Sequence, residues 1–366
     1  MSIYCLVLIL AKQLLQEHIY KKEKTNRMKA AFYTRKGEFT VGEGKSIQPG
    51  PGEVRLDVAF CGVCGTDVHI YHGVMDQRVN PPQTVGHEAS AVVAEIGEGV
   101  TNVQVGDRVA VRPLKFGEPH PFDKGYAHVG KNLKFIGIDS QGAFQNSWTV
   151  PAYTLHKLPE DLSLQNGAFI EPLSVACHDV KIGRVKAGEN CMVIGGGPIG
   201  TLIAFVLKEK GANVIISEIN ETRLEMLSGF GFSVINPIKE NVTERVSELT
   251  NEAMIDCAFE VSGSQPGVQT MTDVVNVRGR IVMVAIHGGE QKKVDLFKFF
   301  WSEIELLGAR LYQEDDYEEA IRIASSGNIP FDVLTTKVSS LDEIQSVFEE
   351  IDNNPAGMKY LIDCQQ

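Results

Sequence analysis

The pattern of hydrophobic and polar positions changes near residue 180 of the chain. Between residues 29 and about 150, short apolar segments separated by turns predict β-strands. Residues 54–60 alternate between apolar and polar like a half-buried strand, residues 89–96 form an apolar run, and residues 106–111 begin with a turn that enters a further strand. This part of the chain is therefore predicted to be rich in β-structure.

Beyond residue 180, six near-continuous apolar segments predict buried strands. They are residues 191–195, 214–218, 233–236, 256–261, 280–286 and 303–308. The first three alternate with helical patterns at residues 199–210, 221–228 and 242–249. Alternation of strand and helix predicts an α/β fold with a doubly wound parallel sheet. After about residue 318, an amphipathic stretch at 341–351 and a strand-like segment at 357–363 suggest a return to the first domain.

Length and composition indicate a globular protein of two domains. The chain has 366 residues, of which 43% are hydrophobic and 22% charged, and domains average roughly 150 residues. A net charge of -12 would repel phosphate backbones, so nucleic acid is not an expected partner. Seven cysteines, with only one closely spaced pair, do not form a secreted disulfide framework. Reduced thiols in the cytoplasm fit this count better.

The first 27 residues do not match the pattern of the rest of the chain. Their apolar run at residues 3–11 is too short to span a bilayer, which needs about 20 residues, and it lacks the flanks of a signal peptide. We expect no membrane association. Two interpretations remain: an amphipathic leader, or an extension ahead of a natural start at Met28.

A glycine-rich turn follows the strand predicted at 191–195. It consists of Gly195, Gly197 and Gly200, together with Pro198 and Ile199, and it opens an apolar helix. Alone, such a string is a weak signal, because glycine turns are common. Between a strand and a helix, the same string is typical of a dinucleotide-binding site, where the helix N-terminus faces the pyrophosphate.

An acidic residue at the end of the next strand favours NAD over NADP. Glu218 lies 23 residues after Gly195, near the spacing of about 20 at which a carboxylate accepts hydrogen bonds from the ribose hydroxyls. Arg223 follows and could instead serve the 2′-phosphate of NADP. We expect NAD(H), because a carboxylate would repel that phosphate.

A second group of residues has the chemistry of a metal site. Cys61 and Cys64 are followed by His69, and His87 and Glu88 lie 23 and 24 residues after Cys64. Thiolate, imidazole and carboxylate are ligands of Zn²⁺. A four-cysteine site would need a second pair, and a redox dithiol would need a thioredoxin-like setting. Two core thiols with a surface histidine would be the simplest alternative.

Five strings taken together resemble the zinc-dependent medium-chain dehydrogenase/reductase family, in the branch of polyol, threonine and butanediol dehydrogenases. They are CGVCGTDVH (61–69), GHE (86–88), GDRVAV (106–111), IEPLSVACH (170–178) and GGGPIG (195–200). The resemblance implies a GroES-like catalytic domain at 28–178 and 319–366. A Rossmann domain that binds NAD at 179–318 would interrupt it, and 1–27 would be an extension.

The resemblance also implies the zinc ligands. In the family pattern these correspond to Cys64, His87 and Glu88, with Glu171 approaching the metal directly or through water. Cys61 would pack in the core instead.

Asp67 would orient His87 through its ring N–H, as acidic neighbours of ligating histidines do.

One departure from many family members concerns a second metal. Residues 112–148 contain no cysteine, so the four-cysteine lobe for a structural zinc cannot form. We therefore expect one zinc per chain. His120 and His128, in the same region, are expected to be ordinary loop residues. Animal sorbitol dehydrogenases share this loss, which favours a polyol as substrate.

The family pattern further implies the groups that move protons. Thr66 would contact the substrate oxygen, and His69 would continue the relay to solvent. Zinc would act as a Lewis acid toward that oxygen. Thr66 could also, or instead, cap the helix that follows. His69 could instead be a structural residue or a contact to the ribose of NAD.

Substrate and nicotinamide contacts are the least specific of these expectations. Tyr71 follows the relay residues and is expected to face the substrate. Arg310 and Tyr312 resemble an Arg–Tyr pair of polyol enzymes, although here one residue separates them. Ends of Rossmann strands are expected to line the nicotinamide pocket, namely Ser262, Ala285 and Ile286.

The sequence thus predicts an NAD- and zinc-dependent dehydrogenase of a small-molecule secondary alcohol, polyol or sugar-derived hydroxyl. We also expect a homo-oligomer, either a dimer or a tetramer. Two alternatives remain: a zinc-free quinone or enoyl reductase of the same fold, and a non-catalytic NAD-binding protein. No string in the sequence specifies the alcohol.

Overall fold

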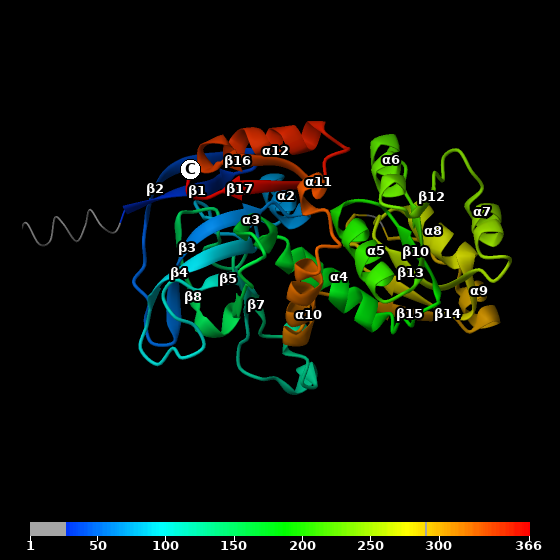
Figure 1. Cartoon of the computed structure of the whole chain (residues 1–366), viewed down its shortest axis with the longest axis horizontal. Coiled ribbons are helices and arrows are strands. Elements are labelled where there is room, and N and C mark those ends of the chain that lie inside the picture. The colour runs from blue at the N-terminus through cyan, green and yellow to red at the C-terminus, as the bar shows by residue number, and fades with distance from the viewer. Residues whose placement is uncertain (1–26, 290) are drawn as a thin grey trace, which may run out of the picture.

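A computed structural model of the chain describes residues 27–366, apart from residue 290. The leader at residues 1–26, and with it the choice between the two interpretations of the extension, lies outside the described residues. Two large sheets, joined by helices, dominate the architecture (Figure 1).

The first sheet carries one of the four candidate zinc ligands, Glu88, at the first position of β4. It has seven strands, of which six run in the order β16-β17-β3-β4-β5-β9, while β8 pairs with β3. Neighbouring strands are antiparallel except for β16 and β17. Its strands are β3 (Glu53–Gly62), β4 (Glu88–Ile96), β5 (Arg108–Val111), β8 (Ser147–Pro151), β9 (Leu155–Lys157), β16 (Thr335–Ser340) and β17 (Lys359–Asp363). The C-terminal segment thus returns to the first domain, as the strand-like pattern at residues 357–363 suggested.

The second sheet has six parallel strands in the order β12-β11-β10-β13-β14-β15. The strands are β10 (Asn190–Ile194), β11 (Asn213–Ser217), β12 (Ser233–Ile235), β13 (Ile255–Glu260), β14 (Val275–Met283) and β15 (Glu305–Gly308). Its helices are α5 (Pro198–Glu209), α6 (Glu221–Gly229), α7 (Val242–Leu249), α8 (Gln265–Val274) and α9 (Leu296–Ser302). The six strands and first three helices lie within a few residues of the predicted positions, apart from the longer β14. The predicted α/β fold is confirmed.

Two helices join the sheets. They are α4 (Ile170–Ile182) and α10 (Glu314–Ser325), which pack against each other between the domains (Figure 1). The boundaries that we proposed at 178/179 and 318/319 therefore fall inside these helices.

Shorter elements complete the described chain. They are β1 (Arg27–Arg35), β2 (Glu38–Lys45), α2 (Gly65–Tyr71), β6 (Leu114–Lys115), η1 (Pro121–Asp123), η2 (Ala127–Val129), β7 (Lys134–Phe135), η3 (Ala152–Thr154), α3 (Leu164–Gly167), α11 (Phe331–Leu334), η4 (Leu341–Glu343) and α12 (Ile344–Asn353).

The larger hydrophobic core is continuous between the two sheets, because α4, α5 and α10 contribute buried side chains to it. A second, smaller cluster lies within the parallel-sheet domain and includes Met192, Ala258 and Ile281. Across the described residues, no helix is long and apolar enough to cross a membrane. The continuous core holds the two domains in contact, and the candidate site lies where they meet.

Candidate active site

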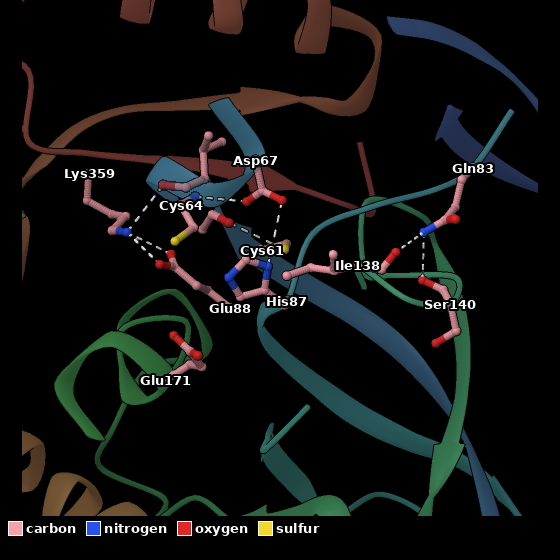
Figure 2. Close-up of polar contacts among 12 residues, drawn as sticks. Cys61, Cys64, Asp67, Gln83, His87, Glu88, Ile138, Ser140, Glu171 and Lys359 are labelled. Atoms are coloured by element: carbon pink, nitrogen blue, oxygen red, sulfur yellow. Dashed lines mark hydrogen bonds and ion pairs between the residues drawn. The ribbon is translucent and has the colours of Figure 1, made fainter. Parts of the chain in front are cut away.

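Three candidate zinc ligands converge although they come from two separate segments. Cys64 caps the N-terminus of α2, while His87 and Glu88 lie at the beginning of β4. Their ligand atoms all lie within 4.8 Å of one another, and His87 and Glu88 are buried (Figure 2). One sulfur, one imidazole nitrogen and one carboxylate oxygen at this spacing match the ligand types of a zinc site.

Asp67 supports this set from the first turn of α2. Its Oδ2 accepts a hydrogen bond from the Cys64 N–H at 2.9 Å, and its Oδ1 lies 3.7 Å from Nδ1 of His87. The last distance exceeds a hydrogen bond, and both atoms are buried without a partner. Asp67 thus lies beside the ring, as expected, but does not bond to it in this structure.

The charges around His87 indicate that the site suits a cation. Burial lowers the pKa of His87, but the charges of Asp67, Cys64 and Glu171 outweigh burial and raise it to about 10. The acidic groups of Cys64, Asp67 and Glu171 therefore all lie close to the buried ring of His87. A divalent metal ion would neutralise them, so the residues present fit zinc.

Glu171 faces the ligand set from α4 (Figure 2). It is not among the three converging donors, and its Oε1 accepts a hydrogen bond from the buried hydroxyl of Tyr312 at 2.7 Å. Burial raises the pKa of Glu171 to about 7. Tyr312, which we expected to contact substrate, thus directly orients this carboxylate.

Lys359 is the functional residue that the sequence did not predict. Its side chain is 5% exposed, and Nζ lies 2.8 and 2.7 Å from the two carboxylate oxygens of Glu88 (Figure 2). Nζ also donates to the carbonyl oxygen of Val63 at 3.2 Å. The sequence places Lys359 at the start of a mostly apolar strand-like segment. This position could have predicted a buried ion pair, because a buried ammonium requires an acidic partner.

Cys61 lies in β3 and is fully buried, and burial raises its pKa well above the ordinary value. It lies outside the three-donor cluster, in agreement with its predicted packing role.

The relay candidates lie on α2. Thr66 is partly buried in the first turn and His69 is exposed. The helix cap is Cys64, so the alternative that Thr66 caps this helix is wrong.

Two expectations for aromatic and histidine residues need correction. Tyr71 packs between Phe39 and Phe348, and its hydroxyl accepts from Gln345, because the far end of α2 turns toward α12 rather than the ligand set. We therefore no longer include Tyr71 among the substrate contacts.

His128 is also not an ordinary loop residue. It is buried against the ring of His178, and burial and that neighbour lower its pKa to about 4. His120 lies in the expected loop, where its ring accepts from the N–H of Phe122.

The glycine turn has the geometry required of a dinucleotide site. Gly195 has a φ of +108°, which favours glycine, and a Cβ at Gly200 would collide with the carbonyl oxygen of Gly195. Gly197 caps α5, and Pro198 and Ile199 occupy its first turn. The N–H groups at this helix end can therefore meet a pyrophosphate.

Glu218 and Arg223 lie beside this turn. The carboxylate of Glu218 accepts hydrogen bonds from the N–H groups of Gly196, Ile219 and Asn220 at 2.7–2.9 Å. Nη1 of Arg223 lies 3.7 Å from Oε2 of Glu218. The carboxylate thus both shapes the turn and holds the arginine.

Three predicted nicotinamide contacts follow β13 and β14. Ser262 donates to Glu260, and Ala285 donates its N–H to the Glu260 carbonyl oxygen at 3.0 Å. Ser262 also lies against Gly195, whereas Ile286 is 73% exposed. The first two are therefore at the coenzyme side of the sheet.

Comparison with known proteins agrees with this geometry. The model of the alcohol dehydrogenase GroES-like domain matches residues 50–160, and that of zinc-binding dehydrogenases matches residues 198–326. A 2-dehydro-3-deoxy-L-galactonate 5-dehydrogenase from Pseudoalteromonas atlantica is 52% identical over 92% of this chain and 99% of its own length. This chain belongs to the zinc-dependent medium-chain dehydrogenase/reductase family.

Solved structures of family members share the fold of this dehydrogenase. 2R,3R-butanediol dehydrogenase from Bacillus subtilis has a TM-score of 0.85 and 29% identity, covering 92% of this chain and 99% of that one. A zinc-binding dehydrogenase from Sinorhizobium meliloti, solved with NADP, has a TM-score of 0.85 and 28% identity at the same coverage. The predicted family and class of reaction, hydride transfer involving an alcohol substrate, are confirmed.

Proposed function

We propose that this dehydrogenase uses one zinc ion per chain and NAD to oxidise a secondary hydroxyl of a polyol or sugar acid. The observation that carries the proposal is the convergence of the ligand atoms of Cys64, His87 and Glu88 within 4.8 Å of one another. The 52% identical relative favours a 2-keto-3-deoxy sugar acid as the substrate.

The protein groups around the metal have separate tasks. Cys64, His87 and Glu88 would hold zinc, which when bound supplies a Lewis acid for the alcohol oxygen. Lys359 and Asp67 hold these ligands in place, and Glu171 lies within reach of the same space, oriented by Tyr312.

Thr66 and His69 are the proposed proton route from the substrate to solvent. The exposure of His69 suits the outer end of such a route. Because hydroxide replaces the relay at high pH, His69→Gln should slow turnover mainly at low pH, by about 10²-fold. A deficit that is independent of pH, at full zinc occupancy, would contradict this role.

NAD would lie on the glycine turn, with its ribose near Glu218 and its nicotinamide near Ser262 and Ala285. Glu218 supports NAD over NADP, because its charge also neutralises Arg223, the nearby group suited to a 2′-phosphate. The protein would then orient the nicotinamide toward the ligand set across the interdomain space.

We also propose that two copies of the chain associate and that they work in the cytoplasm. Helix α9 exposes Phe297, Phe300 and Trp301, each 63–78% exposed, beside β15 at the edge of the parallel sheet. A second copy would bury this patch. The six cysteines of the described chain are unpaired, which supports a reducing compartment.

A metal assay combined with a substrate panel tests the function. Atomic spectroscopy after dialysis should find one zinc per chain, and Cys64→Ser should lose it while still binding NAD. Reduction of NAD should be measured with 2-dehydro-3-deoxy-L-galactonate, xylitol, 2,3-butanediol and threonine. Two zinc ions per chain, or no turnover of any alcohol by the zinc-loaded protein, would refute the proposal.

A further inference from the structure

The loop that follows β13 lies between the glycine turn and the end of β14. Ser262 is against the turn, because a Cβ at Gly195 would be 3.1 Å from its backbone nitrogen. On the other side of the loop, a Cβ at Gly263 would be 3.5 Å from Cβ of Ala285. Strands β10, β13 and β14 pair in parallel, so their carboxyl ends share one edge of the sheet (Figure 1). His287, just beyond β14, therefore lies at the edge where a dinucleotide binds in such folds.

Glu260, the last residue of β13, holds this loop in place. Its side chain is fully buried. The carboxylate accepts hydrogen bonds from the N–H groups of Ser262 and Gly263 at 3.0 and 3.1 Å, and the Ser262 hydroxyl also donates to it. These bonds fix the position of the carboxylate at the edge of the sheet.

The ring of His287 lies against this carboxylate. Its Nε2 is 2.9 Å from Oε2 of Glu260, and its side chain is 19% exposed. The two groups are not aligned as a hydrogen bond, and neither ring nitrogen makes a hydrogen bond to a residue that the structure describes. Both nitrogens are nevertheless shielded from solvent. A buried polar atom without a partner costs free energy, so the ring indicates that a bound ligand supplies the missing partner.

The charge of Glu260 determines what the second ring nitrogen of His287 can do. The carboxylate favours a proton on Nε2, and a neutral imidazole then has no proton on Nδ1. Nδ1 is therefore an acceptor that needs an N–H donor. Glu218, the proposed ribose contact of the adenosine half, follows β11 on the other side of β10. The β13 and β14 side is left for the nicotinamide half, whose carboxamide carries an N–H donor.

We propose that His287 binds the carboxamide of the nicotinamide ring, with Nδ1 accepting a hydrogen bond from the amino group and Glu260 fixing the tautomer. The proposal rests on the proposed function, since that function brings a nicotinamide coenzyme to this edge of the sheet. A held carboxamide cannot rotate with its ring about the glycosidic bond. The contact would therefore fix which face of the nicotinamide meets the substrate.

Calorimetric binding to the zinc-loaded protein tests the contact with three ligands. They are NAD, its 3-acetylpyridine analogue, in which a methyl group replaces the amino group, and ADP-ribose, which has no nicotinamide. His287→Phe should raise the Kd of NAD by about tenfold, because one buried hydrogen bond is lost, and should leave the Kd of ADP-ribose unchanged. The analogue, which cannot donate, should lose little. His287→Asn keeps an acceptor near the position of Nδ1 and should restore part of the affinity for NAD.

His72→Phe is the matched control. Nε2 of His72 lies 3.0 Å from Asp352, and its side chain is 41% exposed, so this variant should bind all three ligands like wild type. An equal loss of NAD and ADP-ribose in His287→Phe would mean that His287 supports the loop or contacts ribose, and it would overturn the proposal. Unchanged NAD binding, or an equal loss of NAD and the acetylpyridine analogue, would also overturn it.

The proposed function can fail separately from this contact. If wild type binds NADP and not NAD, the proposed coenzyme is wrong. The same comparison is then made with NADP and 2′-phospho-ADP-ribose, because both coenzymes carry the same carboxamide. A loss confined to NADP in His287→Phe would still support the contact, whereas an equal loss of the fragment would overturn it.

Discussion

Lys359 is not a zinc ligand in our proposal, but it holds the proposed ligand Glu88 in place. Its ammonium neutralises Glu88 in a buried setting, and removing one partner of a buried ion pair costs about 3–5 kcal/mol. We expect Lys359→Met to lower the free energy of unfolding of the metal-free protein by that amount. Urea denaturation after dialysis against a chelator measures it.

Lys337 provides the matched control, because it pairs with Glu350 at 2.9 Å while both side chains are 37% exposed. Exposed pairs contribute about 0–1 kcal/mol, so Lys337→Met should change little. If Lys359→Met is no more damaging than this control, Lys359 does not stabilise the site.

Glu218 is the residue on which coenzyme choice depends. We expect Glu218→Ala to weaken NAD binding by about tenfold or more, because charge-assisted hydrogen bonds to the ribose contribute about 1.5–3 kcal/mol. NADP binding should weaken less, since Arg223 would be released from Glu218. Fluorescence titration with both coenzymes decides this, and adding Arg223→Ala to Glu218→Ala should weaken NADP binding further. Equal weakening of both would show that Glu218 only shapes the turn.

At the scale of elements, α4 and α10 are joined by a buried pair. Nδ1 of His178 lies 2.7 Å from Oδ2 of Asp316, and both side chains are 3% exposed. Burial would raise the pKa of Asp316, but hydrogen bonds from His178 and the Gln313 N–H outweigh it and lower the pKa. A lowered folded-state pKa stabilises the fold above the unfolded value of about 3.9, and this stabilisation disappears as pH falls through the folded value.

Asp316→Asn should therefore lower the free energy of unfolding by about 3 kcal/mol at pH 7. The difference from wild type should shrink below about pH 4. Denaturant titrations across pH 3–8 measure it. Asp315→Asn is the exposed control, because Lys181 bonds the carboxylates of both Asp315 and Asp316. A difference that does not change with pH would mean that the carboxylate charge is not involved.

The elements also explain what could be predicted from the sequence. The parallel strands and the glycine turn are local patterns, so residues 190–218 contained their own signals. The contact of Lys359 with Glu88 joins residues 271 positions apart, and no local pattern encodes it. Tyr71 failed as a substrate contact because closeness in sequence to the relay residues did not give the direction of its side chain.

At the scale of the whole molecule, the aromatic surface of α9 predicts association. Wild type at micromolar concentration should have at least twice the mass of one chain in light scattering, and Phe300→Asp should shift it toward the monomer, because a charge would be placed in the buried patch. Phe122→Asp is the control, since Phe122 is 73% exposed in η1, far along the chain from α9. A monomeric wild type would refute this interface.

The contacts that position the ligand set do not require the ion itself. The N–H of Cys64 is held by Asp67, and the carboxylate of Glu88 is held by Lys359, and neither contact includes a metal ion. Small zinc domains differ, because they unfold when the ion is removed. We expect the chelated protein to keep its far-UV circular dichroism and a cooperative melt, and to regain activity on adding zinc without refolding. Zinc would then bind after folding is complete. The amount of folded but inactive protein would therefore depend on how much zinc the cell has available.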